Sequence, residues 1–158
     1  MNDYLALGLF LAANFAAASS GAVFRPGDWY DALSKPAWTP PDWLFPVAWS
    51  VLYVMIAAAG WLIWREAGWT APALALYALQ LVLNAVWSAL FFGLRRPGWA
   101  LIEVSVLWAA IVATIWAFYP ISPLAAALMA PYAVWVTFAA VLNAEIVRRN
   151  PQAHALSP

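Results

Sequence analysis

Long stretches with at most one charged residue constrain the fold of this sequence more than any other feature. A helix that crosses the hydrocarbon core of a membrane needs about 20 mostly apolar residues. Stretches of that length occur at residues 4–24, 43–64, 71–94, 99–119 and 124–147. Because lipid cannot satisfy backbone polar groups, a chain of this kind crosses it as helices. The sequence therefore predicts an all-α membrane protein, a single domain over residues 1–158 built as a five-transmembrane-helix bundle.

Composition supports a membrane location and excludes several kinds of site. Hydrophobic residues make up 66% of the chain and charged residues 9%, whereas a soluble domain is about a quarter charged. So few charges could not cover a water-soluble domain of 158 residues. The formal net charge is zero, which leaves no basic surface for nucleic acid. The sequence contains no cysteine, which excludes disulfides and thiolate metal sites.

The first span is interpreted as a retained helix. Small residues at 16–22 resemble a signal-peptide cleavage region, but the only charge before the span is Asp3, and signal peptides begin with basic residues. The connection that follows, residues 25–42, contains four prolines that interrupt any continuous helix: Pro26, Pro36, Pro40 and Pro41. Within this connection we expect residues 28–33 to form a short helix at the membrane interface.

Basic residues cluster at one end of the predicted bundle. With five spans, six of the seven lie on the side of the first loop and the C-terminus: Arg25, Lys35, Arg95, Arg96, Arg148 and Arg149. Arg65 is the exception and lies on the other side. Cytoplasmic loops of membrane proteins carry an excess of Lys and Arg, so we expect the first loop and the C-terminus to face the cytoplasm.

The third span has two different faces. Helical periodicity places Gln80, Asn84, Trp87 and Phe91 on one face. Amide side chains are costly in hydrocarbon, so this face should point into the bundle. The opposite face carries small residues, which allow helices to approach closely: Ala71, Ala75, Ala78, Val82, Ala85 and Ala89. This alanine stripe is expected either to join two copies in a homodimer or to pack inside one subunit.

Aromatic faces recur on the second and fifth spans. One stripe consists of Phe45, Trp49, Tyr53, Ile56 and Gly60. The other consists of Pro131, Trp135, Phe138, Ala139, Leu142 and Ile146. If these stripes and the amide face of the third span converge, they form an apolar cavity lined by large flat rings. The alternative is helix packing without a ligand.

Catalytic and metal-binding patterns are scarce, and the sequence nominates no catalytic residue or metal ligand. The single histidine, His154, lies in the C-terminal tail, so neither a Ser-His-Asp arrangement nor a His-rich metal site is available. Glu103 and Glu145 lie within predicted spans, where an ionisable side chain is a candidate functional group. Pairing with a nearby arginine is the alternative role for each carboxylate.

Three motifs in order resemble the TspO/MBR family, which includes bacterial tryptophan-rich sensory proteins and the mitochondrial translocator protein. The first motif runs from Lys35 to Tyr53 as KPAWTPPDWLFPVAWSVLY. The second begins QLVLNAVW at Gln80 and continues to Phe91-Phe92-Gly93. The third begins PYAVW at Pro131 and continues to Asn143. With five spans at matching spacing, the resemblance covers nearly the whole chain.

The resemblance implies a homodimer that binds tetrapyrroles, with protoporphyrin IX or haem as ligand and no obligatory cofactor. It also implies that sterols and benzodiazepine-type drugs are candidate ligands. Matching the motifs residue by residue places eight side chains around the pocket: Trp49, Tyr53, Asn84, Trp87, Phe92, Trp135, Phe138 and Ala139. Trp38 is expected over the mouth of this pocket, and Phe45 lies on the same face as Trp49.

The expected function is a membrane sensor or regulator that binds tetrapyrroles. One alternative is an enzyme that degrades bound porphyrin in light, with Trp49 and Trp135 as redox-active rings. The other is a transporter of porphyrin or sterol, for which the five spans show no evident inverted repeat. Residues 141–148 lack the tyrosine of a sterol-recognition motif, so sterol binding through that motif is not expected. The expected location is a bacterial cell membrane, with the outer membrane as the alternative.

Overall fold

A computed structural model of the protein describes residues 2–24, 27–69 and 72–151. The predictions for Arg25, Ala71 and His154 concern positions outside these described residues. The helices, in chain order, are α1 (Asp3–Val23), α2 (Asp28–Asp31), α3 (Leu44–Ala67), α4 (Pro72–Ser88), α5 (Pro97–Phe118) and α6 (Pro123–Arg149). A π-helical turn, η1 (Ala89–Gly93), continues α4 without a break. Within the described ranges the chain is therefore helical almost throughout.

Five of these helical segments are long and apolar enough to cross a membrane: Asp3–Val23, Leu44–Ala67, Pro72–Gly93, Pro97–Phe118 and Pro123–Arg149. The prediction of an all-α, five-helix membrane bundle is confirmed. The largest difference in the bounds is at the end of α3, which continues to Ala67 instead of residue 64. The expected short interfacial helix is present as α2, although it ends at Asp31.

Residues at the helix ends explain where the helices begin and stop. The side chain of Asn2 accepts a hydrogen bond of 2.8 Å from the backbone N–H of Leu5, which caps the start of α1. Pro97 and Pro123 occupy the first turns of α5 and α6, where a missing N–H costs nothing. Gly68 ends α3 with a φ of 73°, a conformation that glycine adopts without strain.

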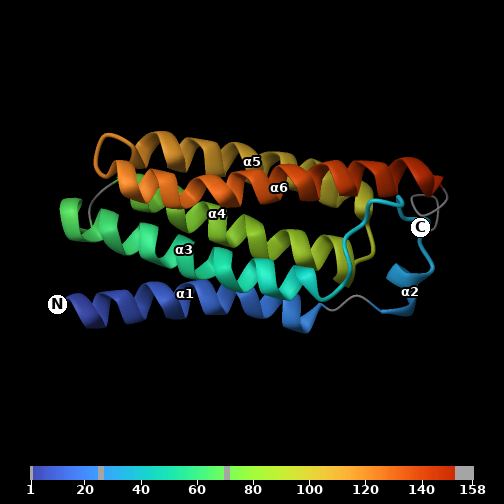
Figure 1. Ribbon diagram of the computed structural model, residues 1–158, viewed down its shortest axis with the longest axis horizontal. Helices are drawn as coiled ribbons and strands as arrows, with labels where there is room; N and C mark the ends of the chain where they lie inside the picture. Colours follow the sequence, from blue (N-terminus) through green and yellow to red (C-terminus); the bar gives the residue numbers. More distant parts are fainter. Residues whose placement is uncertain (1, 25–26, 70–71, 152–158) are drawn as a thin grey trace.

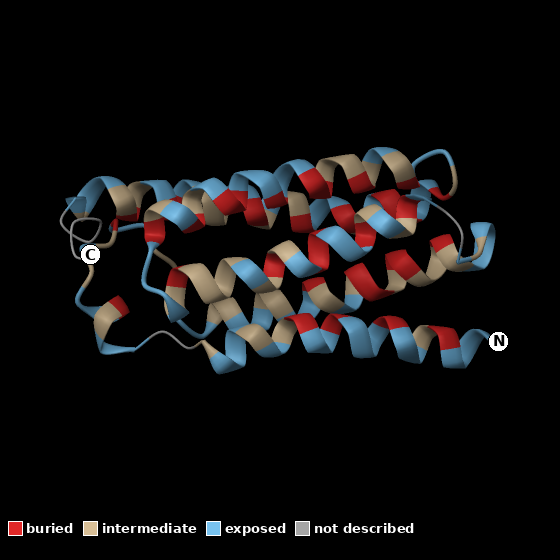
Figure 2. Ribbon diagram, turned by 180° about the vertical axis from the view of Figure 1, so that it is seen from behind, coloured by how far each residue is buried: buried red, intermediate tan, exposed pale blue. Residues whose placement is uncertain are grey.

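The five long helices run along the length of the molecule (Figure 1), and their contacts close into a ring. α1 packs against α3 and α4, α3 packs against α6, and α5 packs against both α4 and α6. α3 and α4 contact each other over only a short stretch. Buried residues form stripes on the faces that the helices turn toward one another, while exposed residues cover the outer faces (Figure 2). Space can therefore remain in the middle of the ring, between α1, α3, α4 and α6.

The two ends of the bundle differ in charge. The N-terminus lies at one end and the described C-terminal residues lie at the other, beside α2 (Figure 1). The latter end, called the loop end below, carries Lys35, Arg95, Arg96, Arg148 and Arg149. The opposite end carries Arg65, whose Nε lies 3.4 Å from Oδ2 of Asp3. The asymmetry of basic residues in the described chain thus follows the prediction, while the side of the membrane that each end faces stays a prediction.

Close contact between α1, α3 and α4 depends on Gly60. A β-carbon at this position would lie 2.7 Å from the ring of Tyr77 and 2.8 Å from the ring of Phe10. The rings of Phe10 and Tyr77 meet edge to face at 5.6 Å, and both are buried. A larger residue at position 60 must therefore displace two core rings from two neighbouring helices.

We expect Gly60→Ala to lower the free energy of unfolding by about 1–3 kcal/mol, because overpacking outweighs the higher helix propensity of alanine. Thermal unfolding in detergent, followed by circular dichroism, measures this change. Gly8→Ala is the matched control, because a β-carbon at Gly8 in α1 meets no atom within 4 Å. If both variants unfold at the same temperature, the close packing around Gly60 is not needed for stability.

Candidate ligand-binding site

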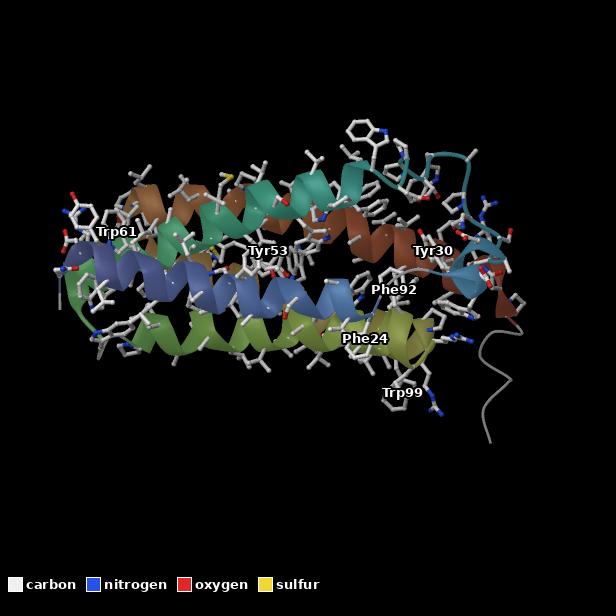
Figure 3. All side chains as sticks on the ribbon, turned by 90° about the horizontal axis from the view of Figure 1, so that it is seen from below. Phe24, Tyr30, Tyr53, Trp61, Phe92 and Trp99 are labelled. Carbon is white, nitrogen blue, oxygen red and sulfur yellow. The ribbon has the colours of Figure 1, made fainter. Side chains whose placement is uncertain are left out.

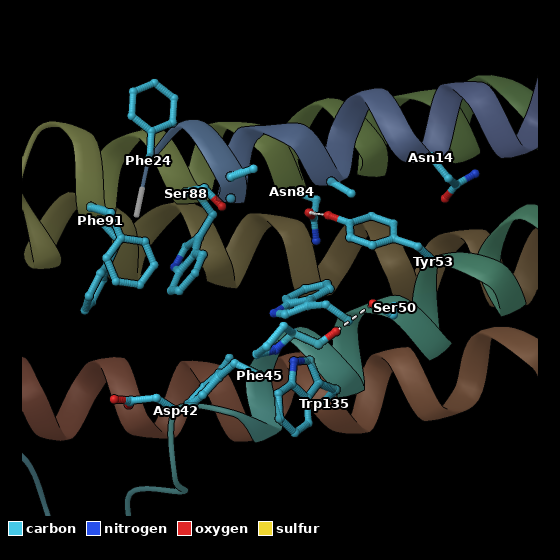
Figure 4. A pocket seen from close by; sticks show the side chains of 18 of the residues that line it. Asn14, Phe24, Asp42, Phe45, Ser50, Tyr53, Asn84, Ser88, Phe91 and Trp135 are labelled. Atoms are coloured by element: carbon cyan, nitrogen blue, oxygen red, sulfur yellow. Dashed lines mark hydrogen bonds between the residues drawn. The ribbon is translucent and has the colours of Figure 1, made fainter. Parts of the chain in front are cut away.

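A cavity of about 730 Å³ lies inside the ring of helices, in the half nearest the loop end (Figure 4). Its lining comes from α1, α3, α4 with η1, and α6, together with Tyr30 from α2 and Asp42 from the loop before α3. Eight of the residues nominated from the sequence line it: Phe45, Trp49, Tyr53, Asn84, Trp87, Phe92, Trp135 and Ala139. The fold therefore brings together residues from three separate motifs. This volume lies within the range of about 300–1,000 Å³ that is typical of small-molecule sites.

Trp38 and Phe138 do not line the cavity but pack beside it. Their ring centroids are 5.8 Å apart, and Phe138 in turn lies 5.5 Å from Trp135. The loop that carries Trp38 is tied to the end of α6, because the N–H of Ser34 donates to Oδ1 of Asn150 at 2.9 Å. Nδ2 of Asn150 donates back to the carbonyl of Ser34 at 3.0 Å. The loop thus follows α6, and Trp38 supports the wall formed by Trp135.

One wall of the cavity consists of aromatic rings from α3 and α6. Trp49 lies at the centre of this wall, with ring centroids 5.4 Å from Tyr53, 6.1 Å from Tyr132 and 6.4 Å from Trp135. The rings of Trp49 and Trp135 are nearly perpendicular, at 87°. Phe45 extends the wall through an edge contact of 5.8 Å with Trp135. Such ring faces and edges suit a broad, flat, apolar ligand.

Asn84 joins three helices at the inner part of the cavity. The hydroxyl of Tyr53 on α3 donates to Oδ1 of Asn84 on α4 (Figure 4). Nδ2 of Asn84 donates to the hydroxyl of Tyr132 on α6 at 2.9 Å. Tyr132 is fully buried. Both polar atoms of the Asn84 amide are thus hydrogen-bonded within the protein, where they link α3, α4 and α6.

A second amide, Asn143, joins α4, α5 and α6. Its Oδ1 accepts a hydrogen bond of 3.3 Å from the indole N–H of Trp87, and its Nδ2 donates to the carbonyl of Pro97 at 2.8 Å. Asn143 lines the cavity and is buried. Sequence reasoning assigned no role to Tyr132 or Asn143, although both stand in the third family motif. Their polarity within an apolar span was the available signal, because a buried polar group needs a partner.

The π-helical turn η1 shapes the loop end of the cavity. Consecutive residues Phe91 and Phe92 both line the cavity, with ring centroids 4.8 Å apart. An inserted residue in a helix changes the direction of the side chains that follow it. At the end of η1, a β-carbon on Gly93 would lie 2.7 Å from the ring of Phe24. The end of α1 therefore leans on η1, and Phe24 and Phe92 lie at the loop end, far from Trp61 (Figure 3).

The cavity opens sideways between α1 and α3. Several residues line it and are also exposed on the outer surface, among them Leu11 and Phe15 on α1 and Ser50 and Val54 on α3. Phe15 is 78% exposed. Because the end of α1 leans toward η1, it leaves the adjacent part of α3 uncovered. In a membrane-spanning bundle, an opening at this depth faces lipid.

Polar groups gather at the loop end of the cavity. Burial, together with the nearby carboxylates of Asp42 and Asp31, raises the pKa of Tyr30 above its usual range. The phenol of Tyr30 therefore stays protonated at neutral pH and can donate a hydrogen bond. Nζ of Lys35 donates to the carbonyl of Tyr30 at 2.7 Å and lies 4.2 Å above its ring. A positive charge is thus held beside this end of the cavity.

The two glutamates of the spans have different surroundings. Glu145 accepts hydrogen bonds of 2.8 and 2.6 Å from Arg148 and of 2.6 Å from Arg149. It therefore pairs with arginines at the loop end, the alternative role considered above. Glu103 is buried on α5, and its carboxylate oxygens have no hydrogen-bond partner among the described residues. It does not line the cavity.

These features define a class of protein: an integral, multi-pass membrane protein whose five spans enclose an aromatic cavity. Residues 6–149 match the sequence profile of the TspO/MBR family, and the chain belongs to this family. It is 42% identical over 156 residues to the "Tryptophan-rich sensory protein" of Cereibacter sphaeroides, which covers 97% of this chain and 98% of that protein. The resemblance inferred from the three motifs is confirmed.

Two further relatives show how widely this similarity extends. "Protein CrtK" of Rhodobacter capsulatus is 38% identical over 146 residues, covering 90% of this chain and 91% of that protein. The "Translocator protein" of Homo sapiens is 40% identical over 148 residues, covering 91% of this chain and 84% of that protein. Bacterial and animal relatives therefore match this chain over nearly its whole length.

Proposed function

We propose that the protein binds flat tetrapyrroles, with protoporphyrin IX as the model ligand, and serves as a membrane sensor or regulator of them. The observation that carries the proposal is the wall of perpendicular indoles, Trp49 and Trp135, inside a cavity of about 730 Å³. A porphyrin presents a broad apolar disc that stacks on such rings. The sensory role is supported by the name that the relative from Cereibacter carries, "Tryptophan-rich sensory protein".

The charge distribution suggests how such a ligand would be oriented. A porphyrin of this kind carries two propionates on one edge and apolar groups on the opposite edge. Tyr30 lines the loop end of the cavity together with Asp42, and its phenol can donate to an anionic group there. Lys35 lies beside this end, bonded to the carbonyl of Tyr30 and 4.0 Å from Asp31. The apolar edge would then point toward the middle of the bundle. We likewise propose that the loop end faces the cytoplasm of a bacterial cell, since it carries most of the basic residues.

Titration of the purified protein with protoporphyrin IX tests the proposal. We expect saturable quenching of tryptophan fluorescence, because three of the twelve tryptophans, Trp49, Trp87 and Trp135, line the cavity. Free N-acetyltryptophanamide in the same detergent is the control for quenching without a binding site. Quenching of the folded protein that rises without saturation, as it does for the free compound, would contradict tetrapyrrole binding.

A light-dependent enzyme is a second candidate, and it rests on one feature of the cavity. The indoles of Trp49 and Trp135 are 6.4 Å apart, and neither N–H is hydrogen-bonded within the described parts of the chain. Oxidisable rings beside a photosensitiser can react with it or be damaged by it. Illumination in air of excess porphyrin with protein distinguishes these roles. An enzyme converts many equivalents to one product, whereas a binding protein loses its own tryptophan fluorescence.

We propose that the alanine stripe of α4 joins two copies of the chain. Within one chain Ala75, Ala78 and Val82 are exposed, so packing inside the subunit does not use this part of the stripe. We expect Ala78→Leu with Ala85→Leu to convert dimers to monomers in mild detergent, measured by light scattering, because leucine keeps helices apart. Ala127→Leu with Ala130→Leu, on an exposed part of α6, is the control. A stripe variant that stays dimeric would place the interface elsewhere.

A further inference from the structure

Asn14 is a buried amide in the middle of α1 that lines the cavity and has an unused oxygen. Its side chain is 1% exposed. Nδ2 donates to the carbonyl of Phe10 at 2.8 Å and contacts the hydroxyl of Tyr77. Oδ1 has no hydrogen-bond partner among the described residues. A buried carbonyl oxygen is costly to leave unpaired, so this atom needs an explanation.

The amide of Asn14 cannot easily turn to find another partner. Rotation of the amide would break the bond from Nδ2 to the carbonyl of Phe10 and place two acceptor oxygens together, a cost that a new hydrogen bond from the hydroxyl of Tyr77 to Oδ1 does not remove. In Figure 4 the oxygen of Asn14 points to the side on which Tyr53 and Asn84 lie, and the nitrogen points away. The acceptor is therefore held in a fixed direction, toward the space that a ligand would occupy.

The other amides of the cavity are already paired. Asn84 uses its oxygen and its nitrogen with two tyrosines, and Asn143 uses both with Trp87 and Pro97. Gln80 on α4 is also buried with an unpartnered amide, but it does not line the cavity. In the described part of the chain, Asn14 is thus the cavity residue whose buried acceptor is left for a ligand.

We propose that Oδ1 of Asn14 accepts a hydrogen bond from the ligand and selects molecules with a hydroxyl or N–H group on their inner edge. This inference rests on the proposed function and adds a chemical requirement to it. A tetrapyrrole whose carboxylates lie at the loop end presents its opposite edge to Asn14. An O–H group on that edge would pair the oxygen, whereas a vinyl or ethyl group would leave it unpaired.

Two porphyrins that differ at this edge provide the test. Haematoporphyrin IX and mesoporphyrin IX share the macrocycle and both propionates. Haematoporphyrin carries two 1-hydroxyethyl groups on the opposite edge, where mesoporphyrin carries two ethyl groups. The dissociation constants of both are measured by fluorescence quenching for the wild type and for Asn14→Leu. Comparing the ratio of the two constants between proteins cancels the different partitioning of the two porphyrins into detergent.

We expect Asn14→Leu to lower the preference for haematoporphyrin over mesoporphyrin roughly three- to tenfold relative to the wild type. Gln80→Leu is the matched control, because it exchanges a buried unpaired amide for leucine outside the cavity. Its ratio should equal that of the wild type. An unchanged ratio in Asn14→Leu, or an equal change in Gln80→Leu, overturns the proposal.

A measurement on the wild type keeps the test decisive if Asn14→Leu does not fold. The dimethyl ether of haematoporphyrin keeps both oxygens but lacks the O–H donors, so it should bind more weakly than the alcohol. Equal affinity for the ether and the alcohol overturns the role of Asn14, while tetrapyrrole binding itself stands. Failure of every porphyrin to bind instead refutes the proposed function, and this inference with it.

Discussion

Replacing Asn84 by leucine is expected to destabilise the protein by about 3 kcal/mol. The change leaves the hydroxyls of Tyr53 and Tyr132 without a hydrogen-bond partner, because both bond to this amide. Each buried hydroxyl left without a partner costs about 1–3 kcal/mol. Since Tyr132 is fully buried, water cannot replace the lost bond there without rearrangement of the helices. Unfolding by a denaturing detergent, followed by circular dichroism, measures the loss.

Gln80→Leu is the control for the loss of an amide from α4. Gln80 is buried about one helical turn before Asn84, and neither of its amide atoms has a hydrogen-bond partner among the described residues. Its replacement leaves no neighbouring group without a hydrogen-bond partner, so the free energy of unfolding is expected to stay the same or to rise. If Asn84→Leu is no more destabilising than Gln80→Leu, the link between α3, α4 and α6 contributes little to stability. Asn84→Leu with Tyr53→Phe and Tyr132→Phe should recover part of the loss.

Replacing Ala139 by tryptophan is expected to weaken protoporphyrin IX binding roughly tenfold or more. Ala139 lines the cavity one turn after Trp135 on α6, so an indole there occupies ligand space. Each ring contact that the porphyrin loses lowers the binding free energy by about 0.5–1.5 kcal/mol, in addition to the apolar burial that is lost. The loss of two such contacts therefore weakens binding about tenfold or more. The fold should persist, because the added ring fills existing space. Fluorescence titration measures the affinity, and circular dichroism checks the fold.

Val141→Trp is the control for the face of α6 that was changed. Val141 is 55% exposed and does not line the cavity, so its replacement should leave porphyrin affinity unchanged. Equal weakening by Val141→Trp and Ala139→Trp would mean that the effect comes from α6 as a whole. Wild-type affinity in Ala139→Trp would show that the porphyrin binds outside this cavity.

The five spans could be predicted because their signal is local. Hydropathy over about 20 residues and the prolines between the apolar stretches determine where a helix can cross lipid. Helical periodicity also sufficed to place Trp49, Tyr53 and Asn84 on inward faces. Periodicity alone does not show which of these faces meet, because that depends on the arrangement of the helices. The match to the three family motifs indicated which residues converge.

Contacts between distant parts of the chain could not be predicted. Tyr132 becomes a partner of Asn84 only when the helices close into a ring in which α4 and α6 face each other across the interior. The sequence around either residue does not indicate this pairing. Asn14 gained its importance from a cavity formed largely by other helices. The path of the loop around Trp38 depends on the bonds between Ser34 and Asn150, which are 116 positions apart. The turn η1 ends at Gly93, but nothing in its sequence indicates the π-helical geometry.

The opening between α1 and α3 affects what ligand concentration means for this protein. For a ligand that enters through this gap from the hydrocarbon, occupancy follows the mole fraction of the ligand among lipids. At a fixed total amount of such a ligand, added lipid dilutes it within the membrane and lowers the occupancy of the site. An affinity measured in detergent must therefore be expressed per mole of amphiphile before it can be compared with an affinity measured in vesicles.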